Sequence, residues 1–229
     1  MKPLTLLALL GAGVGLASIA SARSAPVSPS RPGGVRVLEH MENAPYPGGS
    51  AIVLMPEQEP RILIVHLRGN SSTAEEAAHK LAGLDLGAAV VVIPEFVPNA
   101  PHESAGRWSE PGRFDAFLAE LGPEFGGDLP TSLVAHSGGY LAAAAVLSAN
   151  PVAQLAHVAL LDALYAREDA FFTYARGSGN LVALAAPGGK PAKNGRELAR
   201  ALGVSVGSSV SEAELATKEP VFAEVSVAH

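Results

Sequence analysis

The sequence contains no cysteine in its 229 residues. The protein therefore forms no disulfide and has neither a thiol nucleophile nor a cysteine ligand for a metal ion. The same absence excludes a lipid anchor attached through cysteine. A folded domain of this chain has to be held together by its hydrophobic core.

Aromatic residues and positive charges are also scarce. Phe, Trp and Tyr make up 5% of the residues, and the formal net charge is −6. No basic run is present to bind phosphates, and few rings are available to stack on bases or on long glycans. The composition therefore argues against a nucleic-acid partner.

The beginning of the chain has the pattern of an export signal. Lys2 precedes an apolar stretch, residues 4–19, which small residues follow. This order is typical of a secretory signal peptide, and an uncleaved membrane anchor is the alternative. We expect residues 1–22 to be the signal peptide, residues 23–34 to be a disordered Pro/Ser/Gly-rich tether, and residues 35–229 to form a single domain. The mature protein would be periplasmic or secreted, without stable membrane insertion, and a monomer or weak oligomer.

Short runs rich in Val, Ile and Leu alternate with amphipathic or alanine-rich stretches after the tether. This pattern predicts an α/β fold with a doubly wound, mostly parallel eight-stranded sheet and helices on both faces. Only a short turn separates the first two strands, so that pair can be antiparallel. The expected strands are residues 35–41, 51–55, 62–66, 88–93, 132–136, 158–161, 181–185 and 222–228, and the expected helices are residues 73–82, 112–121, 139–149, 197–202 and 212–217.

The most informative segment joins the fifth expected strand to the alanine-rich helix after it. It reads Ala135-His136-Ser137-Gly138-Gly139. A sharp strand-to-helix turn needs small residues on both sides of its central serine and pushes the serine Oγ out of the sheet. The amide after the serine lies at the start of a helix, where the helix dipole also favours an oxyanion. We therefore predict Ser137 as a nucleophile and Gly138 as one oxyanion donor.

This segment resembles the G-x-S-x-G nucleophile elbow of the α/β-hydrolase fold family, with Ala135 in place of the first glycine. The resemblance implies a serine hydrolase that forms an acyl-enzyme and needs no metal or organic cofactor. A carboxylic ester, small or part of the cell envelope, is the first expected substrate, and an amide or peptide is the second. A non-catalytic relative that binds a ligand or partner in the cell envelope is the alternative of another class.

The resemblance also implies a histidine base late in the chain. His229 follows the last expected strand, where the family places this base, and it is also the last residue of the sequence. His102 and His66 are the alternatives. His136 directly precedes the nucleophile, so its side chain is expected to point away from Ser137 Oγ.

For the acid, the resemblance favours a carboxylate after the sixth or the seventh strand. Asp162 ends the sixth expected strand, whereas no carboxylate follows the seventh strand before Glu197. We therefore predict Asp162 as the acid. An Asp that only caps the turn after the strand is the alternative.

Two further segments are expected at the same edge of the sheet. After the third strand, Gly69-Asn70 resembles the Gly-x part of the family's His-Gly-x loop, and the resemblance implies the Asn70 amide as the second oxyanion donor. Arg68 is the alternative donor, or a candidate for binding an anionic group of the substrate. The long loop after the fourth strand contains His102 and Trp108, which are candidates for one wall of a substrate pocket. Residues 165–179 are expected to form the opposite wall or a short lid helix.

Overall fold

The computed structural model describes residues 33–46, 48–70, 72–96, 105–125, 127–149, 155–178, 180–211, 214 and 219–225. The predicted signal peptide and most of the tether lie outside these residues, as do His102 and His229. Of the helix expected over residues 212–217, only Glu214 is described. No helix among the described residues is long and apolar enough to cross a membrane.

The described residues form one sheet in the order β1-β2-β4-β3-β5-β6-β7-β9-β8. Strand β2 is antiparallel to β1 and to β4, and every other neighbouring pair is parallel. This confirms the mostly parallel sheet and its antiparallel first pair, and adds a two-residue strand, β8, that the sequence did not predict. The strands are β1 (Gly34–Met41), β2 (Gly49–Met55), β3 (Ile62–Leu67), β4 (Ala89–Pro94), β5 (Thr131–His136), β6 (Leu155–Leu161), β7 (Leu181–Ala185), β8 (Val206–Gly207) and β9 (Val221–Glu224).

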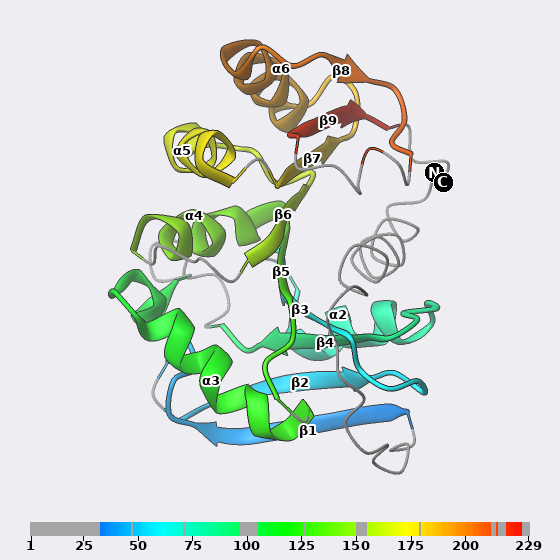
Figure 1. Cartoon of the computed structure of the whole chain (residues 1–229), viewed down its shortest axis with the longest axis vertical. Helices are drawn as coiled ribbons and strands as arrows, with labels where there is room; N and C mark the ends of the chain where they lie inside the picture. Colours follow the sequence, from blue (N-terminus) through cyan, green and yellow to red (C-terminus); the bar gives the residue numbers. More distant parts are fainter. Residues whose placement is uncertain are drawn as a thin grey trace, which may run out of the picture.

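Helices cover both faces of the sheet, as expected. Helix α2 lies on one face, and α3, α4, α5 and α6 lie on the other (Figure 1). The inner strands alternate between two apolar clusters, so that each face is buried under its own set of helices. The α-helices are α2 (Ala74–Ala82), α3 (Arg113–Phe125), α4 (Tyr140–Ala149), α5 (Glu168–Ser178) and α6 (Lys190–Leu202).

The helices differ from the sequence-based expectation mainly at their ends. Helix α2 begins at Ala74, after its N-cap Thr73, whose side chain accepts a hydrogen bond from the Glu76 amide. Helix α6 begins at Lys190 and not at Glu197, with Pro191 in its first turn, where the missing proline N–H removes no helical hydrogen bond.

The strand order produces a topological switch point between β3 and β5. From β3 the chain passes through α2 to β4 on one side, whereas β5 pairs with β3 on the other side. Loops leaving two such strands diverge and leave room at the carboxyl edge of the sheet, where α/β proteins bind their ligands. The segments after β3 and β5 are those that contain Asn70 and Ser137.

Candidate active site

Ser137 lies on a sharp turn between β5 and α4. His136 is still extended, with φ −112° and ψ 131°, whereas Ser137 has a φ of 49°. A non-glycine residue with positive φ is strained, and such strain persists where the surrounding structure enforces it. Residues Ser137–Gly139 form one 3-10 turn that leads into α4. The serine therefore occupies the strained strand-to-helix turn that the sequence predicted.

Gly139 allows this turn to lie against the end of β3. A Cβ at this position would lie 2.3 Å from the carbonyl oxygen of Leu67 and 3.0 Å from that of Arg68. Both atoms belong to the backbone and cannot rotate away. The glycine two residues after the serine is thus required by the close approach of β3 to the start of α4.

We expect Gly139→Ala to lower the free energy of unfolding by about 3 kcal/mol, because the new methyl group forces β3 and the turn apart. Gly138→Ala is the matched control. Its Cβ would meet the side chain of Asn70, which is exposed and can rotate away. Urea unfolding measures the free energy of unfolding of both variants. An equal decrease in the two would show that the contact with Leu67 does not cause the loss of stability.

The structure brings the two predicted oxyanion residues together. A Cβ on Gly138 would lie 2.4 Å from Oδ1 of Asn70, so the segment after β3 lies directly against the residue after the nucleophile. Gly69, which precedes Asn70, lies beside the serine itself. A Cβ at Gly69 would lie 3.2 Å from Ser137 Cβ and 3.6 Å from its Oγ. Gly138 and the segment Gly69-Asn70 therefore lie together beside Ser137.

Asp162 follows β6 and reaches across to β7. It also has a positive φ, 48°, and its amide donates a hydrogen bond to the Leu184 carbonyl over 2.7 Å. Its carboxylate Oδ1 accepts a hydrogen bond from the Ala186 amide, with an N–O distance of 3.3 Å. Ala186 directly follows β7. Asp162, the predicted acid, thus places its carboxylate at the end of β7.

Tyr165 lies close to Ser137 and Asp162, whereas the sequence predicted it only as part of a pocket wall. The side chains of both residues affect its pKa. Burial is the main cause that raises the pKa of Tyr165 above its ordinary value, and the charge of Asp162 raises it further. The signal in the sequence was its position three residues after the candidate acid.

Two histidines lie near the nucleophile turn. Burial, with a smaller effect of His136, lowers the pKa of His66 to about 4, and its Nδ1 has no hydrogen-bond partner in the part of the chain that the structure describes. Loss of contact with water is the main cause that lowers the pKa of His136, although Asp162 acts in the opposite direction and Lys80 adds to the decrease. His66 and His136 each lie two residues after a residue of the apolar cluster on the α2 face, Ile64 and Val134, and so start from the same face of their strands. A Cβ on Gly69 would nevertheless lie 3.6 Å from His136 Nδ1 and 3.6 Å from Ser137 Oγ, so the expectation that His136 points away from the serine is not confirmed.

Arg68 has a structural position that the sequence did not indicate. The residue is 5% exposed, and its guanidinium donates to the carbonyls of Gly69, Ser72 and Phe96. It also pairs with the Glu95 carboxylate at 3.3 Å. These contacts tie the segment after β3 to the end of β4. The guanidinium thus supports the segment that contains Asn70, which differs from the predicted contact with an anionic substrate group.

Trp108 differs in the same way from the pocket-wall residue that we expected. It is fully buried, with its ring packed edge-on against Phe96 and Phe114, and its Nε1 donates to the Asn43 carbonyl over 3.0 Å. The ring belongs to the hydrophobic core between the sheet and α3. Trp108 therefore stabilises the domain by packing in its core.

Trp108→Phe is therefore expected to lower the free energy of unfolding by about 1–2 kcal/mol, because it leaves the Asn43 carbonyl without its donor and a gap beside the ring. KM for an ester substrate should stay within about twofold of the wild-type value, since the energy of one lost contact to substrate is larger than that. Thermal unfolding measures the change in stability, and steady-state kinetics measure KM. A raised KM at unchanged stability would show that Trp108 contacts the substrate.

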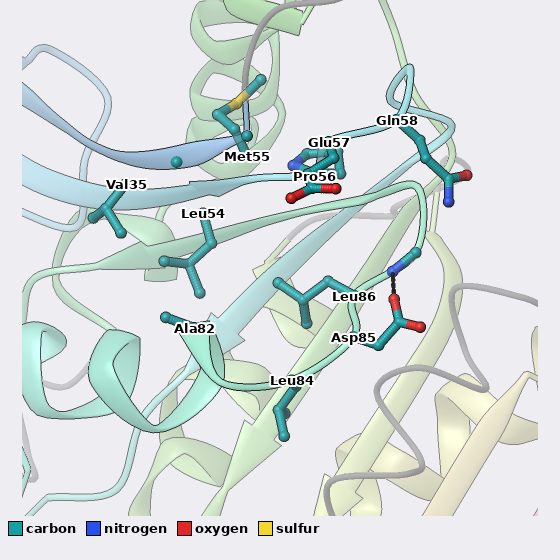
Figure 2. Close-up of a pocket in the computed structure, with 13 residues that line it drawn as sticks. Val35, Leu54, Met55, Pro56, Glu57, Gln58, Ala82, Leu84, Asp85 and Leu86 are labelled. Carbon is teal, nitrogen blue, oxygen red and sulfur yellow. Dashed lines mark hydrogen bonds between the residues drawn. The ribbon is translucent and has the colours of Figure 1, made fainter.

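A hollow of about 430 Å³ lies away from these residues. Figure 2 shows Leu54, Met55 and Glu57 on one side of it and Asp85 and Leu86 on the other. These residues end β2 and precede β4, so the hollow opens at the edge of the sheet opposite to Ser137. It is separate from the candidate active site. Among the described residues, no three His, Asp or Glu side chains gather so that they would hold a metal ion.

Comparison with known proteins gives a clear result only for three-dimensional structure. No family model matches the sequence, and no curated protein matches it. TT1662 from Thermus thermophilus superposes with a TM-score of 0.55 at 16% identity, covering 84% of this chain and 89% of that protein. A cold-adapted esterase from an Arctic intertidal metagenomic library gives 0.53 at 14% identity and 90% coverage of both chains. FphF, a fluorophosphonate-binding serine hydrolase of Staphylococcus aureus, gives 0.52 at 12% identity, covering 86% and 91%. At such identities the likeness shows a shared fold.

Proposed function

We propose that this chain, which has the α/β-hydrolase fold, is a serine hydrolase that cleaves a carboxylic ester through an acyl-enzyme intermediate. The observation that carries the proposal is the strained turn at Ser137, enclosed by the glycines and the Asn70 segment. A backbone held in this conformation is expected where an exposed nucleophile has to be presented. The esterase and serine hydrolase among the structures of the same fold support the reaction class.

In the proposed mechanism, Ser137 Oγ attacks the ester carbonyl carbon while its proton passes to His229. The amides of Gly138 and Asn70 stabilise the oxyanion. His229 then gives the proton to the leaving alkoxide as the ester bond breaks, and Asp162 orients the imidazole and stabilises its cation. Water, deprotonated by the same histidine, attacks the acyl-enzyme and releases the acid.

The finer assignments are part of the same proposal. An ester is preferred to an amide because its leaving group needs less assistance, and the cell envelope is a source of acyl substrates for an exported enzyme. Export, as a periplasmic or secreted protein, rests on the pattern of residues 1–22. A monomer or weak oligomer is proposed for the mature protein.

A fluorophosphonate probe tests the proposal on the wild-type protein. An active serine hydrolase should react covalently with the probe, and mass spectrometry of the digested protein should locate the adduct on Ser137. Heat-denatured protein serves as the control and should not react. The same preparation should hydrolyse p-nitrophenyl acetate or butyrate. A folded protein that neither reacts with the probe nor cleaves ester or amide substrates would instead be a binding protein of the cell envelope.

A further inference from the structure

Three hydrogen bonds converge on the backbone carbonyl of Gly69, beside the nucleophile turn. The Ser72 amide donates to this oxygen over 3.3 Å and the Ser72 hydroxyl over 3.2 Å. The Arg68 guanidinium also donates to it, from Nη1 at 3.2 Å. A charged donor makes the stronger and more directional hydrogen bond. The peptide unit between Gly69 and Asn70 is therefore held in one orientation.

The other end of this peptide unit is the Asn70 amide. A peptide bond is planar and trans, so its N–H points opposite to its C=O. Because the Gly69 carbonyl points toward Arg68 and Ser72, the Asn70 N–H points away from both. This amide donates to none of the described residues. Its peptide unit begins at Gly69, where a Cβ would lie 3.2 Å from Ser137 Cβ, so the free N–H is available to a ligand beside the serine.

The Arg68 guanidinium is itself held in place. The residue is 5% exposed, and it also donates to the carbonyls of Ser72 and Phe96. Its partner Glu95, at 3.3 Å, has a side chain that is 38% exposed, so water screens part of that carboxylate's charge. Arginine stays protonated in proteins. A positive charge at the carbonyl end polarises the peptide unit and makes its N–H a stronger donor.

We propose that Arg68 and Ser72 are positioning residues of the oxyanion hole, which act through the peptide unit between Gly69 and Asn70. The assignment rests on the proposed serine hydrolase function. Negative charge develops on the substrate carbonyl oxygen when Ser137 Oγ attacks, and the Asn70 N–H stabilises it best when it already points at that oxygen. The two side chains hold this direction before the substrate binds. Neither side chain touches the substrate, and neither transfers a proton.

Ser72→Ala removes one of the donors and keeps Arg68. We expect kcat for ester hydrolysis to fall about fivefold with KM within about twofold of wild type, because the formation and the breakdown of the acyl-enzyme use the same amide. Ser72→Thr keeps a hydroxyl and should restore the rate. Ser109→Ala is the matched control, since Ser109 Oγ also donates to the carbonyl of a glycine three residues earlier, Gly106, over 2.8 Å. Its kcat should equal that of wild type.

Arg68→Met and Arg68→Lys test the charge. Methionine is neutral and should lower kcat by about 30-fold, whereas lysine keeps a positive donor and should recover part of this loss. A variant with a damaged fold loses active protein, which titration with the fluorophosphonate probe measures, whereas a misdirected amide lowers kcat per active site. If Arg68→Met does not fold, Ser72→Ala and Ser72→Thr still decide.

A second measurement reads the peptide unit without turnover. The chemical shift of an amide nitrogen depends on the hydrogen bonds of the carbonyl in the same peptide unit, so the Asn70 resonance should move upfield in Ser72→Ala and stay in place in Ser109→Ala. An unchanged Asn70 resonance, or a Ser72→Ala variant as fast as wild type, would overturn the assignment. If the resonance moves as expected but wild-type protein neither reacts with the probe nor cleaves esters, the serine hydrolase function fails instead.

Discussion

Ser137→Ala is expected to lower kcat/KM for p-nitrophenyl esters by at least about 10³-fold, because the variant lacks the only proposed nucleophile of the site. Alanine keeps the Cβ that packs beside Gly69, so the turn itself should stay as it is. The residual rate would come from the oxyanion amides and from binding alone. Initial rates of ester hydrolysis by wild type and variant, at equal concentrations of folded protein, give the ratio.

Ser132→Ala provides the control on the same strand. Ser132 is fully buried and its hydroxyl has no hydrogen-bond partner among the described residues, so removing the hydroxyl leaves none of their groups unpaired. Its activity should match that of wild type. A Ser137→Ala variant that keeps most of the activity would exclude the proposed nucleophile and with it the acyl-enzyme.

His229→Ala is the second change with a large expected effect, again a loss of about 10³-fold or more in kcat/KM, because no other group then accepts the Ser137 proton. The structure describes the chain as far as Val225, whose amide donates to the Ala185 carbonyl at the end of β7. The Asp162 carboxylate, the proposed partner of the imidazole, also reaches the end of β7.

His102→Ala is the comparison for this experiment, and it should leave ester hydrolysis within about twofold of wild type. The opposite result, with His102→Ala inactive and His229→Ala active, would make His102 the base. If both variants stay active, neither histidine is the base, and His66 and His136 become the candidates. His66 is uncharged at neutral pH, because burial lowers its pKa.

The parts of the fold that repeat a regular pattern could be predicted from the sequence. The parallel strands β3 to β7 are short apolar runs, since both of their faces are buried, and such runs are recognisable without the structure. The nucleophile turn was equally recognisable, because a serine on a turn between a strand and a helix needs a glycine two residues after it. Strand β8, with only two residues, has no periodicity to recognise.

The side chains of the loops could not be placed in the same way. Arg68 and Trp108 lie next to segments expected at the site, and their types suit substrate contacts as well as structural ones. Whether such a side chain faces the site or the core depends on contacts with distant segments, such as those of Arg68 with Phe96 and of Trp108 with Asn43.

The strand order has a consequence for how the protein acquires its activity during folding. Ser137 and Asp162 follow neighbouring strands, but β3, which Asn70 follows, is separated from its partner β5 by about sixty residues of chain. Pairings between such distant segments form slowly, because the loop has to be closed before the contacts stabilise it. An N-terminal fragment that ends before β5 has no nucleophile, and one that ends before β6 has no acid. Reactivity of Ser137 during refolding therefore reports completion of the central sheet, and it should appear later than helical structure.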